Sequence, residues 1–113
     1  MSAVTTHVLD TARGTPARGI VVRLETLDGA LVGKGRTDDD GRVRELGPER
    51  LAAGTYRIVF EIDEFYAARG EDVFFPEVVV AFTVPEPIRE PAHEHLHIPL
   101  LLSPYAYSTY RGS

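Results

Sequence analysis

From Leu100 to Tyr110 the chain reads LLLSPYAYSTY. So apolar and aromatic a run is not expected to lie free in water, although residues near a chain end usually fray. We therefore expect two packed strands, about residues 93–102 and 105–111. The polar groups that follow them, Arg111 and Ser113, would then be held at a defined place, as a binding or catalytic site requires.

Short segments with the character of β-strands recur through the rest of the chain. Asp28-Gly29 and Asp40-Gly41 mark tight turns between them, because Asp and Gly tolerate a positive φ. One short helix is expected over residues 63–70, with Asp63 as its N-cap and Gly70 at its end. The other expected strands cover residues 4–9, 20–27, 30–37, 42–46, 55–62 and 77–84. About eight short strands separated by turns predict an all-β sandwich or barrel with antiparallel pairing.

Length and composition favour a single domain over residues 1–113. With 43% hydrophobic residues the chain can form one core, and no segment reaches the roughly 20 apolar residues of a membrane helix. The first residues lack the pattern of a signal peptide, so we expect a cytoplasmic protein without membrane partners. The absence of cysteine excludes disulfides and thiolate metal sites, and a net charge of −5 without a basic cluster argues against nucleic acid as a partner.

Three histidines, His93, His95 and His97, alternate within a segment predicted to be extended. Alternate residues of a strand share a face, about 7 Å apart per step. The row is compatible with a metal site, with acid–base chemistry or with a solvated polar face. A metal site is the least favoured of these interpretations, because adjacent positions on one face seldom supply three ligands to one ion.

Two further residues have side chains suited to acid–base catalysis or to binding an anionic group. His7 lies in the first expected strand, within THVLD, and Arg42 directly follows the Asp40-Gly41 turn. Histidine titrates near neutral pH, and arginine binds anionic oxygens through a planar fork. Taken singly, His7 is typical of a half-buried strand residue and Arg42 of an exposed turn residue. Spacing does not show that they meet His97.

Four segments occur together in one order: THVLD with His7, DDDGR with Arg42, HLHIPLLLSPY with His97, and a final YRGS. In these segments the chain resembles the 5-hydroxyisourate hydrolases, the transthyretin-related enzymes of purine breakdown. The chain departs from their pattern at Leu96, where tyrosine is usual, at Ala106, where glycine is common, and in the extra His93.

The resemblance implies a transthyretin-like β-sandwich that assembles as a homotetramer, with active sites at the dimer–dimer interface. It implies no cofactor and no metal, and a small purine-derived substrate. It also implies a catalytic trio, which here is His7, Arg42 and His97. The chain end would bind the substrate through Tyr110, Arg111, Gly112 and Ser113.

The implied reaction is hydrolysis of 5-hydroxyisourate to 2-oxo-4-hydroxy-4-carboxy-5-ureidoimidazoline. Water must add to a lactam carbonyl, and a histidine with a pKa near the working pH can take its proton. Either His7 or His97 suits that role, while Arg42 would stabilise developing negative charge. Two alternatives stay open: a non-catalytic transthyretin-like carrier of a small ligand, and a β-domain that binds metal through His93, His95 and His97.

Overall fold

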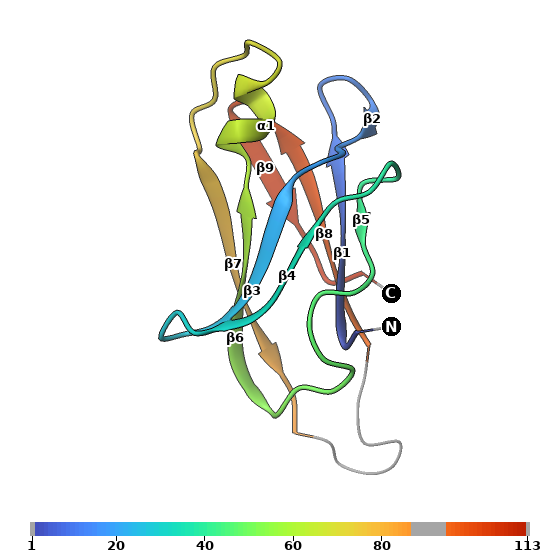
Figure 1. The fold of residues 1–113 in the computed structure, drawn as a ribbon, viewed down its shortest axis with the longest axis vertical. Coiled ribbons are helices and arrows are strands. Elements are labelled where there is room, and N and C mark those ends of the chain that lie inside the picture. Colours follow the sequence, from blue (N-terminus) through green and yellow to red (C-terminus); the bar gives the residue numbers. More distant parts are fainter. Residues whose placement is uncertain (1, 87–94, 113) are drawn as a thin grey trace.

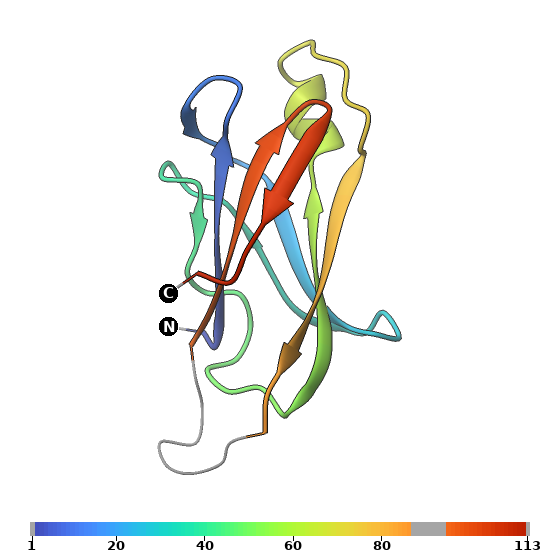
Figure 2. The ribbon, with the colours of Figure 1, turned by 180° about the vertical axis from the view of Figure 1, so that it is seen from behind.

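The computed structural model describes residues 2–86 and 95–112. Its strands form two sheets that face each other, and a short helix lies at one end (Figures 1 and 2). No helix in these residues has the length and apolar character needed to cross a membrane. The elements are β1 (Val4–Asp10), β2 (Thr15–Pro16), β3 (Val21–Thr26), β4 (Leu31–Arg36), β5 (Arg42–Val43), β6 (Gly54–Glu61), α1 (Asp63–Ala67), β7 (Glu77–Val84), β8 (Leu96–Ser103) and β9 (Ala106–Thr109). The expected all-β sandwich with one short helix is confirmed.

The two sheets have the strand orders β2-β1-β8-β9 and β4-β3-β6-β7, and β5 also pairs with β1. Strands β1 and β8 run parallel, with Val4 opposite Leu96 and Asp10 opposite Leu102. The expectation of purely antiparallel pairing is therefore wrong at the centre of this sheet. A short hairpin fixes an antiparallel direction, but no hairpin joins these two strands, which lie near opposite ends of the chain. Their pairing brings the N-terminal and C-terminal segments side by side (Figure 1).

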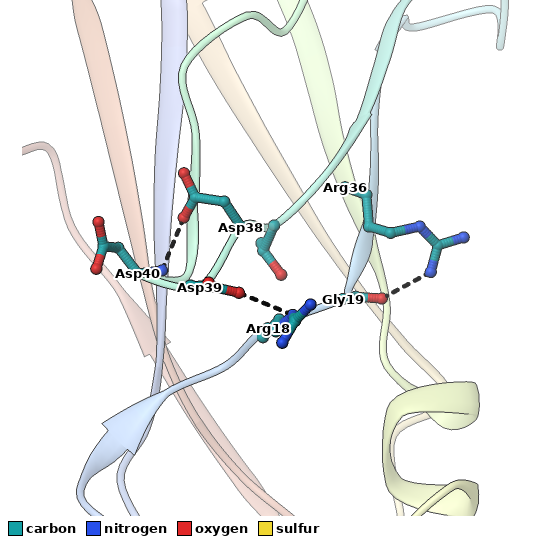
Figure 3. Close-up of a pocket in the computed structure, with 7 residues that line it drawn as sticks. Arg18, Gly19, Arg36, Asp38, Asp39 and Asp40 are labelled. Carbon is teal, nitrogen blue, oxygen red and sulfur yellow. Dashed lines mark hydrogen bonds and ion pairs between the residues drawn. The ribbon is translucent and has the colours of Figure 1, made fainter.

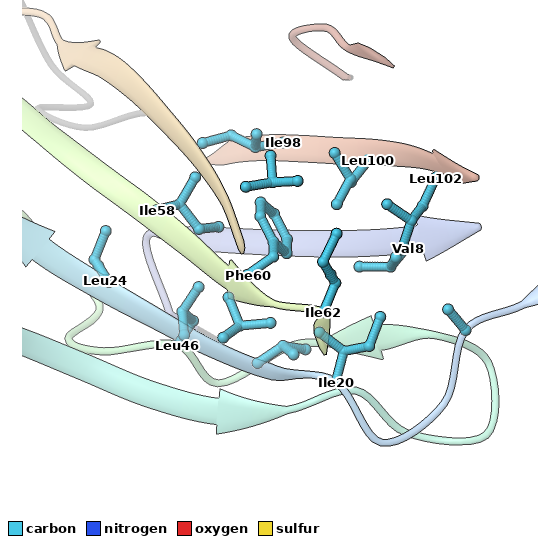
Figure 4. Packing of buried hydrophobic residues seen from close by; sticks show 14 of the residues in the cluster. Val8, Ile20, Leu24, Leu46, Ile58, Phe60, Ile62, Ile98, Leu100 and Leu102 are labelled. Atoms are coloured by element: carbon cyan, nitrogen blue, oxygen red, sulfur yellow. The ribbon is translucent and has the colours of Figure 1, made fainter. Parts of the chain in front are cut away.

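Alternate residues of both sheets point into the space between them and form the core (Figure 4). Val8 and Leu100 of one sheet and Ile58 and Phe60 of the other have exposed fractions of 0%. Burying one such side chain contributes about 1.5–3 kcal/mol. The C-terminal run is buried only in part, because its leucines alternate into this core while Tyr105, Tyr107 and Tyr110 are exposed.

Glycines close the two predicted turns. Gly29 and Gly41 have φ values of 90° and 78°, in the left-handed region that favours glycine. Gly41 also lies so close to β1 that a Cβ on it would be 2.4 Å from the carbonyl oxygen of Val8. The tight turn before Arg42 therefore depends on glycine twice, through its φ and through this close approach.

Helix α1 is shorter than expected. It begins at Asp63, and its N-cap residue is Ile62, which makes no side-chain capping hydrogen bond. The expectation that Asp63 is the N-cap is wrong: Asp63 lies inside the first turn, where its negative charge suits the positive end of the helix. The helix also ends earlier than expected, at Ala67, and Gly70, with a φ of 70°, lies in the turn that follows it. Tyr66, at 1% exposed, packs the helix onto the core.

Candidate active site

Three neighbouring strands carry the candidate catalytic residues. In strand β1, His7 lies opposite Arg42 of β5, and Thr5 lies opposite His97 of β8. Thr5 and His7 are two positions apart and therefore share a face of β1. Their neighbours Thr6 and Val8 are buried on the other face. The pairing thus places His7, Arg42 and His97 on the outer face of the β2-β1-β8-β9 sheet, away from the core.

The aspartate turn before β5 fixes the backbone of Arg42. One carboxylate oxygen of Asp38 accepts hydrogen bonds from the backbone N–H groups of Asp40 and Arg42, both at 2.9 Å. The N–H of Arg42 is the main reason that the pKa of Asp38 lies below its ordinary value. Figure 3 shows this turn together with the ion pair between Arg18 and Asp39, 2.9 Å long. The base of the Arg42 side chain is therefore held at the end of a hydrogen-bonded turn.

The same turn orients His7. Its Nε2 lies 2.8 Å from the backbone carbonyl oxygen of Asp40. A carbonyl oxygen only accepts hydrogen bonds, so Nε2 carries the proton and donates. In the neutral ring the lone pair is then on Nδ1, which is the atom of His7 that can accept a proton.

On the same face of β1, toward β8, the hydroxyl of Thr5 lies between two histidine rings. Its Oγ1 is 2.8 Å from Nε2 of His95 and 2.9 Å from Nδ1 of His97. The two ring centroids are 6.4 Å apart. Sequence reasoning missed Thr5: its place two residues before His7 indicates the shared face of β1 but not its contacts with His95 and His97.

The surroundings of His97 keep its ring neutral. Burial is the main cause that lowers the pKa of His97 below its ordinary value of 6.5. The charge of Arg42 lowers this pKa further, as do His95 and His7. At neutral pH the ring is therefore deprotonated and able to accept a proton, as a general base must.

The chain end lies against His97. The backbone N–H of Gly112 donates to the carbonyl oxygen of His97 at 2.8 Å. A Cβ on Gly112 would be 2.7 Å from Cδ2 of the His97 ring and 3.2 Å from Cγ of Pro99. The terminal segment thus passes so close to the candidate base that only glycine fits. Ser113 lies outside the described residues.

A hollow of about 300 Å³ lies beside His97. Its walls are formed by residues 80–83 of β7, by Leu96, His97 and Ile98 of β8, and by Thr109, Tyr110 and Arg111. His7 and Arg42 are not among its lining residues, so the hollow and the trio share His97 alone. The expected contribution of Tyr110 and Arg111 to a pocket wall fits this arrangement.

The metal alternative concerns the histidine row. Among residues 2–86 and 95–112, no three His, Cys, Asp or Glu side chains are grouped so that they could hold a metal ion. His93, the third member of the row, lies outside these residues. His95 and His97 both contact Thr5, which confirms that they share a face of the extended segment.

Residues 4–112 match the model of the HIUase/Transthyretin family. The chain belongs to this family. Proteins named 5-hydroxyisourate hydrolase are similar over nearly the whole chain: that of Caulobacter vibrioides is 45% identical, with 100% of both chains covered. That of Salmonella typhimurium is 43% identical over 95% of this chain and 78% of its own.

Solved structures agree with this family membership. The 5-hydroxyisourate hydrolase of Klebsiella pneumoniae has a TM-score of 0.86 at 33% identity, covering 100% of this chain and 94% of its own. Sea bream transthyretin in complex with thyroxine has a TM-score of 0.84 at 28% identity, covering 97% of this chain and 94% of its own. The resemblance inferred from the four segments and the transthyretin-like fold are both confirmed.

Proposed function

We propose that this member of the HIUase/Transthyretin family is an enzyme that hydrolyses 5-hydroxyisourate to 2-oxo-4-hydroxy-4-carboxy-5-ureidoimidazoline. The observation that carries the proposal is the strand register that puts His7, Arg42 and His97 on one face of one sheet. The relatives at 43% and 45% identity are named for this activity. A carrier role is less favoured: binding a small ligand needs a cavity, but it gives no reason for two proton-accepting rings beside an arginine.

In the proposed reaction, the oxygen of a water molecule bonds to the lactam carbonyl carbon, and the ring C–N bond then breaks. One histidine takes the proton of the water, through Nδ1 of His7 or Nε2 of His97, and the other orients the water or protonates the departing nitrogen. Arg42 stabilises the negative charge that develops on the carbonyl oxygen. No step requires a metal, a cofactor or a covalent intermediate on the protein.

We further propose that the chain end binds the substrate through Tyr110, Arg111, Gly112 and Ser113. The close approach of Gly112 to His97 supports this assignment, as does the position of Tyr110 and Arg111 in the wall beside the same ring. Polar groups on a positioned backbone can orient a planar substrate for attack.

The cytoplasmic location expected from the sequence remains a proposal, which cell fractionation would test.

We also propose a homotetramer with active sites at the dimer–dimer interface. The apolar C-terminal run does not itself supply the surface for assembly, because Leu100 and Leu102 are fully buried within one chain. A different reason supports the proposal: β7 and β9 are edge strands that carry the exposed side chains of Val79 and Tyr107. Edge strands offer unpaired backbone groups to another copy, and the trio lies on an outer face that a second copy could cover.

The activity is tested by adding the protein to freshly generated 5-hydroxyisourate and following the ultraviolet decay against the spontaneous rate. The proposed enzyme accelerates this decay in proportion to its concentration, while the heat-inactivated protein leaves the spontaneous rate unchanged. A native protein that binds 5-hydroxyisourate without accelerating its decay would favour the carrier.

A further inference from the structure

The Thr5 hydroxyl is poorly accessible to water, with the residue 5% exposed, and it faces nitrogen atoms on two sides. These atoms are Nε2 of His95 at 2.8 Å and Nδ1 of His97 at 2.9 Å. Thr5 belongs to β1, and both histidines belong to the segment that pairs with it in parallel. The contact therefore joins two adjacent strands on the face that carries the proposed active site.

A hydroxyl has one proton and can donate to only one of the two rings. If it donates to His95, it accepts the proton of Nδ1 of His97, and the lone pair of the neutral His97 ring is on Nε2. If it donates to His97, then Nε2 of His97 carries a proton and cannot act as a base. The direction in which the Thr5 hydroxyl donates therefore determines which neutral tautomer His97 adopts.

We propose that Thr5 is a positioning residue that sets the tautomer of His97 by accepting its Nδ1–H while donating to Nε2 of His95, which leaves Nε2 of His97 free to take a proton. In this arrangement His97 keeps the same hydrogen bond before and after it gains a proton. The opposite arrangement would require the hydroxyl to reverse and would oppose proton uptake. This inference rests on the proposed hydrolysis, to which it adds a residue that the four matching segments did not single out.

The same contact affects the basicity of His97. A hydrogen bond accepted from the charged ring stabilises that ring, so Thr5 partly offsets the influences that lower the pKa of His97. These influences are burial, Arg42 on β5, His7 on β1 and His95 on its own segment. Arg111 of the terminal segment also lines the hollow beside His97. Removal of the hydroxyl is expected to lower the pKa of His97 further and to make it a weaker base.

Thr5→Val removes the hydroxyl and keeps the β-branched shape that suits a strand. We expect kcat to fall on the order of tenfold, with a small change in KM, and the acid limb of the kcat/KM pH profile to move to lower pH. Thr5→Ser retains the hydroxyl and should keep the kcat and the acid limb of the wild type. The matched control is Thr6→Val on the same strand, which removes a hydroxyl that donates to the backbone carbonyl of Ile98 at 2.6 Å. This control should leave kcat and the acid limb unchanged.

Nitrogen chemical shifts of ¹⁵N-labelled histidine report the tautomer of His97 and test the role of Thr5 without any substrate. The wild-type protein above pH 7 should show His97 as a single Nδ1–H tautomer, and Thr5→Val should show a mixture. A wild-type His97 in the Nε2–H tautomer, or a tautomer ratio and acid limb unchanged in Thr5→Val, would overturn the proposal. If the wild-type protein failed to hydrolyse 5-hydroxyisourate, the proposed function would fail, and the tautomer measurement would still decide the role of Thr5.

Discussion

At the level of single residues, replacement of His7, Arg42 or His97 by alanine is expected to lower kcat/KM on the order of a hundredfold or more. All three side chains lie outside the core, so the fold should persist. The measurement is the decay of 5-hydroxyisourate at matched folded concentration. Arg18→Ala is the control, because Arg18 is a largely exposed arginine beside the same aspartate turn. Equal losses in Arg18→Ala and Arg42→Ala would contradict the assigned site.

Gly112 provides a second test at one residue. Gly112→Ala puts a Cβ 2.7 Å from the His97 ring, so either the ring or the chain end must move. We expect a loss of activity of tenfold or more, because small displacements of a catalytic group are costly, with little change in thermal midpoint. Ser108→Ala, on exposed β9 of the same terminal segment, should be nearly silent. Full activity in Gly112→Ala would separate the chain end from the site.

The lowered pKa of His97 also predicts a pH dependence of stability. Well above pH 6.5, the ordinary value, the ring is neutral in the folded and unfolded states alike. As the pH falls below 6.5 the unfolded chain takes up the proton first, so the free energy of unfolding decreases until the pH reaches the folded-state pKa. Urea unfolding between pH 7.5 and 5 should show a shallower decrease for His97→Ala than for the wild type. Identical slopes would mean that the pKa of His97 is not lowered.

The sequence pointed to the candidate site residues that lie in recognisable segments and did not single out Thr5. His7, Arg42 and His97 lie in three of the four ordered segments. Threonine is common in strands for reasons of shape alone, so Thr5 carried no comparable signal. Its proposed role depends on the register between β1 and β8, and this register brings together residues 92 positions apart. No local pattern specifies such a pairing.

At the level of elements, an ion pair ties the turn that follows helix α1 to the end of β1. The carboxylate of Asp10, a residue 1% exposed, accepts a hydrogen bond from Nη1 of Arg69 at 2.5 Å. Burial raises the pKa of Asp10, but the hydrogen bonds from Arg69 and from two backbone N–H groups outweigh it and lower the pKa below its ordinary value. The pair therefore stays charged at neutral pH and holds the turn after α1 against the end of β1.

Arg69→Met removes the cation and leaves a buried carboxylate without its charged partner. We expect the free energy of unfolding to fall by about 3 kcal/mol, measured by urea titration at pH 7. The control is Arg13→Met, which breaks an exposed pair with Glu71 and should cost less than about 1 kcal/mol. Similar losses in the two variants would mean that burial adds nothing to the Asp10 contact.

Elements that depend on local interactions were predictable from the sequence, and elements that depend on pairing between distant segments were not. The turns at Gly29 and Gly41 were predictable because a positive φ is a local requirement. The two-residue strand β2 was not, because it exists through its pairing with Leu9 and Asp10 of β1. The parallel direction of β1 and β8 is likewise a property of the assembled sheet. Local sequence thus predicted strands and turns, whereas the neighbours of each strand came from the tertiary structure.

At the level of the whole molecule, the proposed tetramer explains how an open site becomes enclosed. The trio lies on the outer face of a sheet, where water would compete with the substrate for Arg42 and the two histidines. Closing such a face by a second copy removes water and strengthens the electrostatic interactions inside. Assembly and activity are therefore expected to be coupled.

A lysine on an edge strand tests this coupling. Val79 is 43% exposed on β7, an edge of its sheet, and Val79→Lys would place a charge where we propose that copies meet. Light scattering at micromolar concentration should give a tetramer for the wild type and a smaller species for Val79→Lys, with hydrolysis lost in parallel. The matched control is Leu31→Lys, at a residue 59% exposed on β4, the opposite edge of the same sheet. This control should remain tetrameric and active. A wild-type monomer that hydrolyses 5-hydroxyisourate at full rate would show that one chain suffices and that the site is not shared.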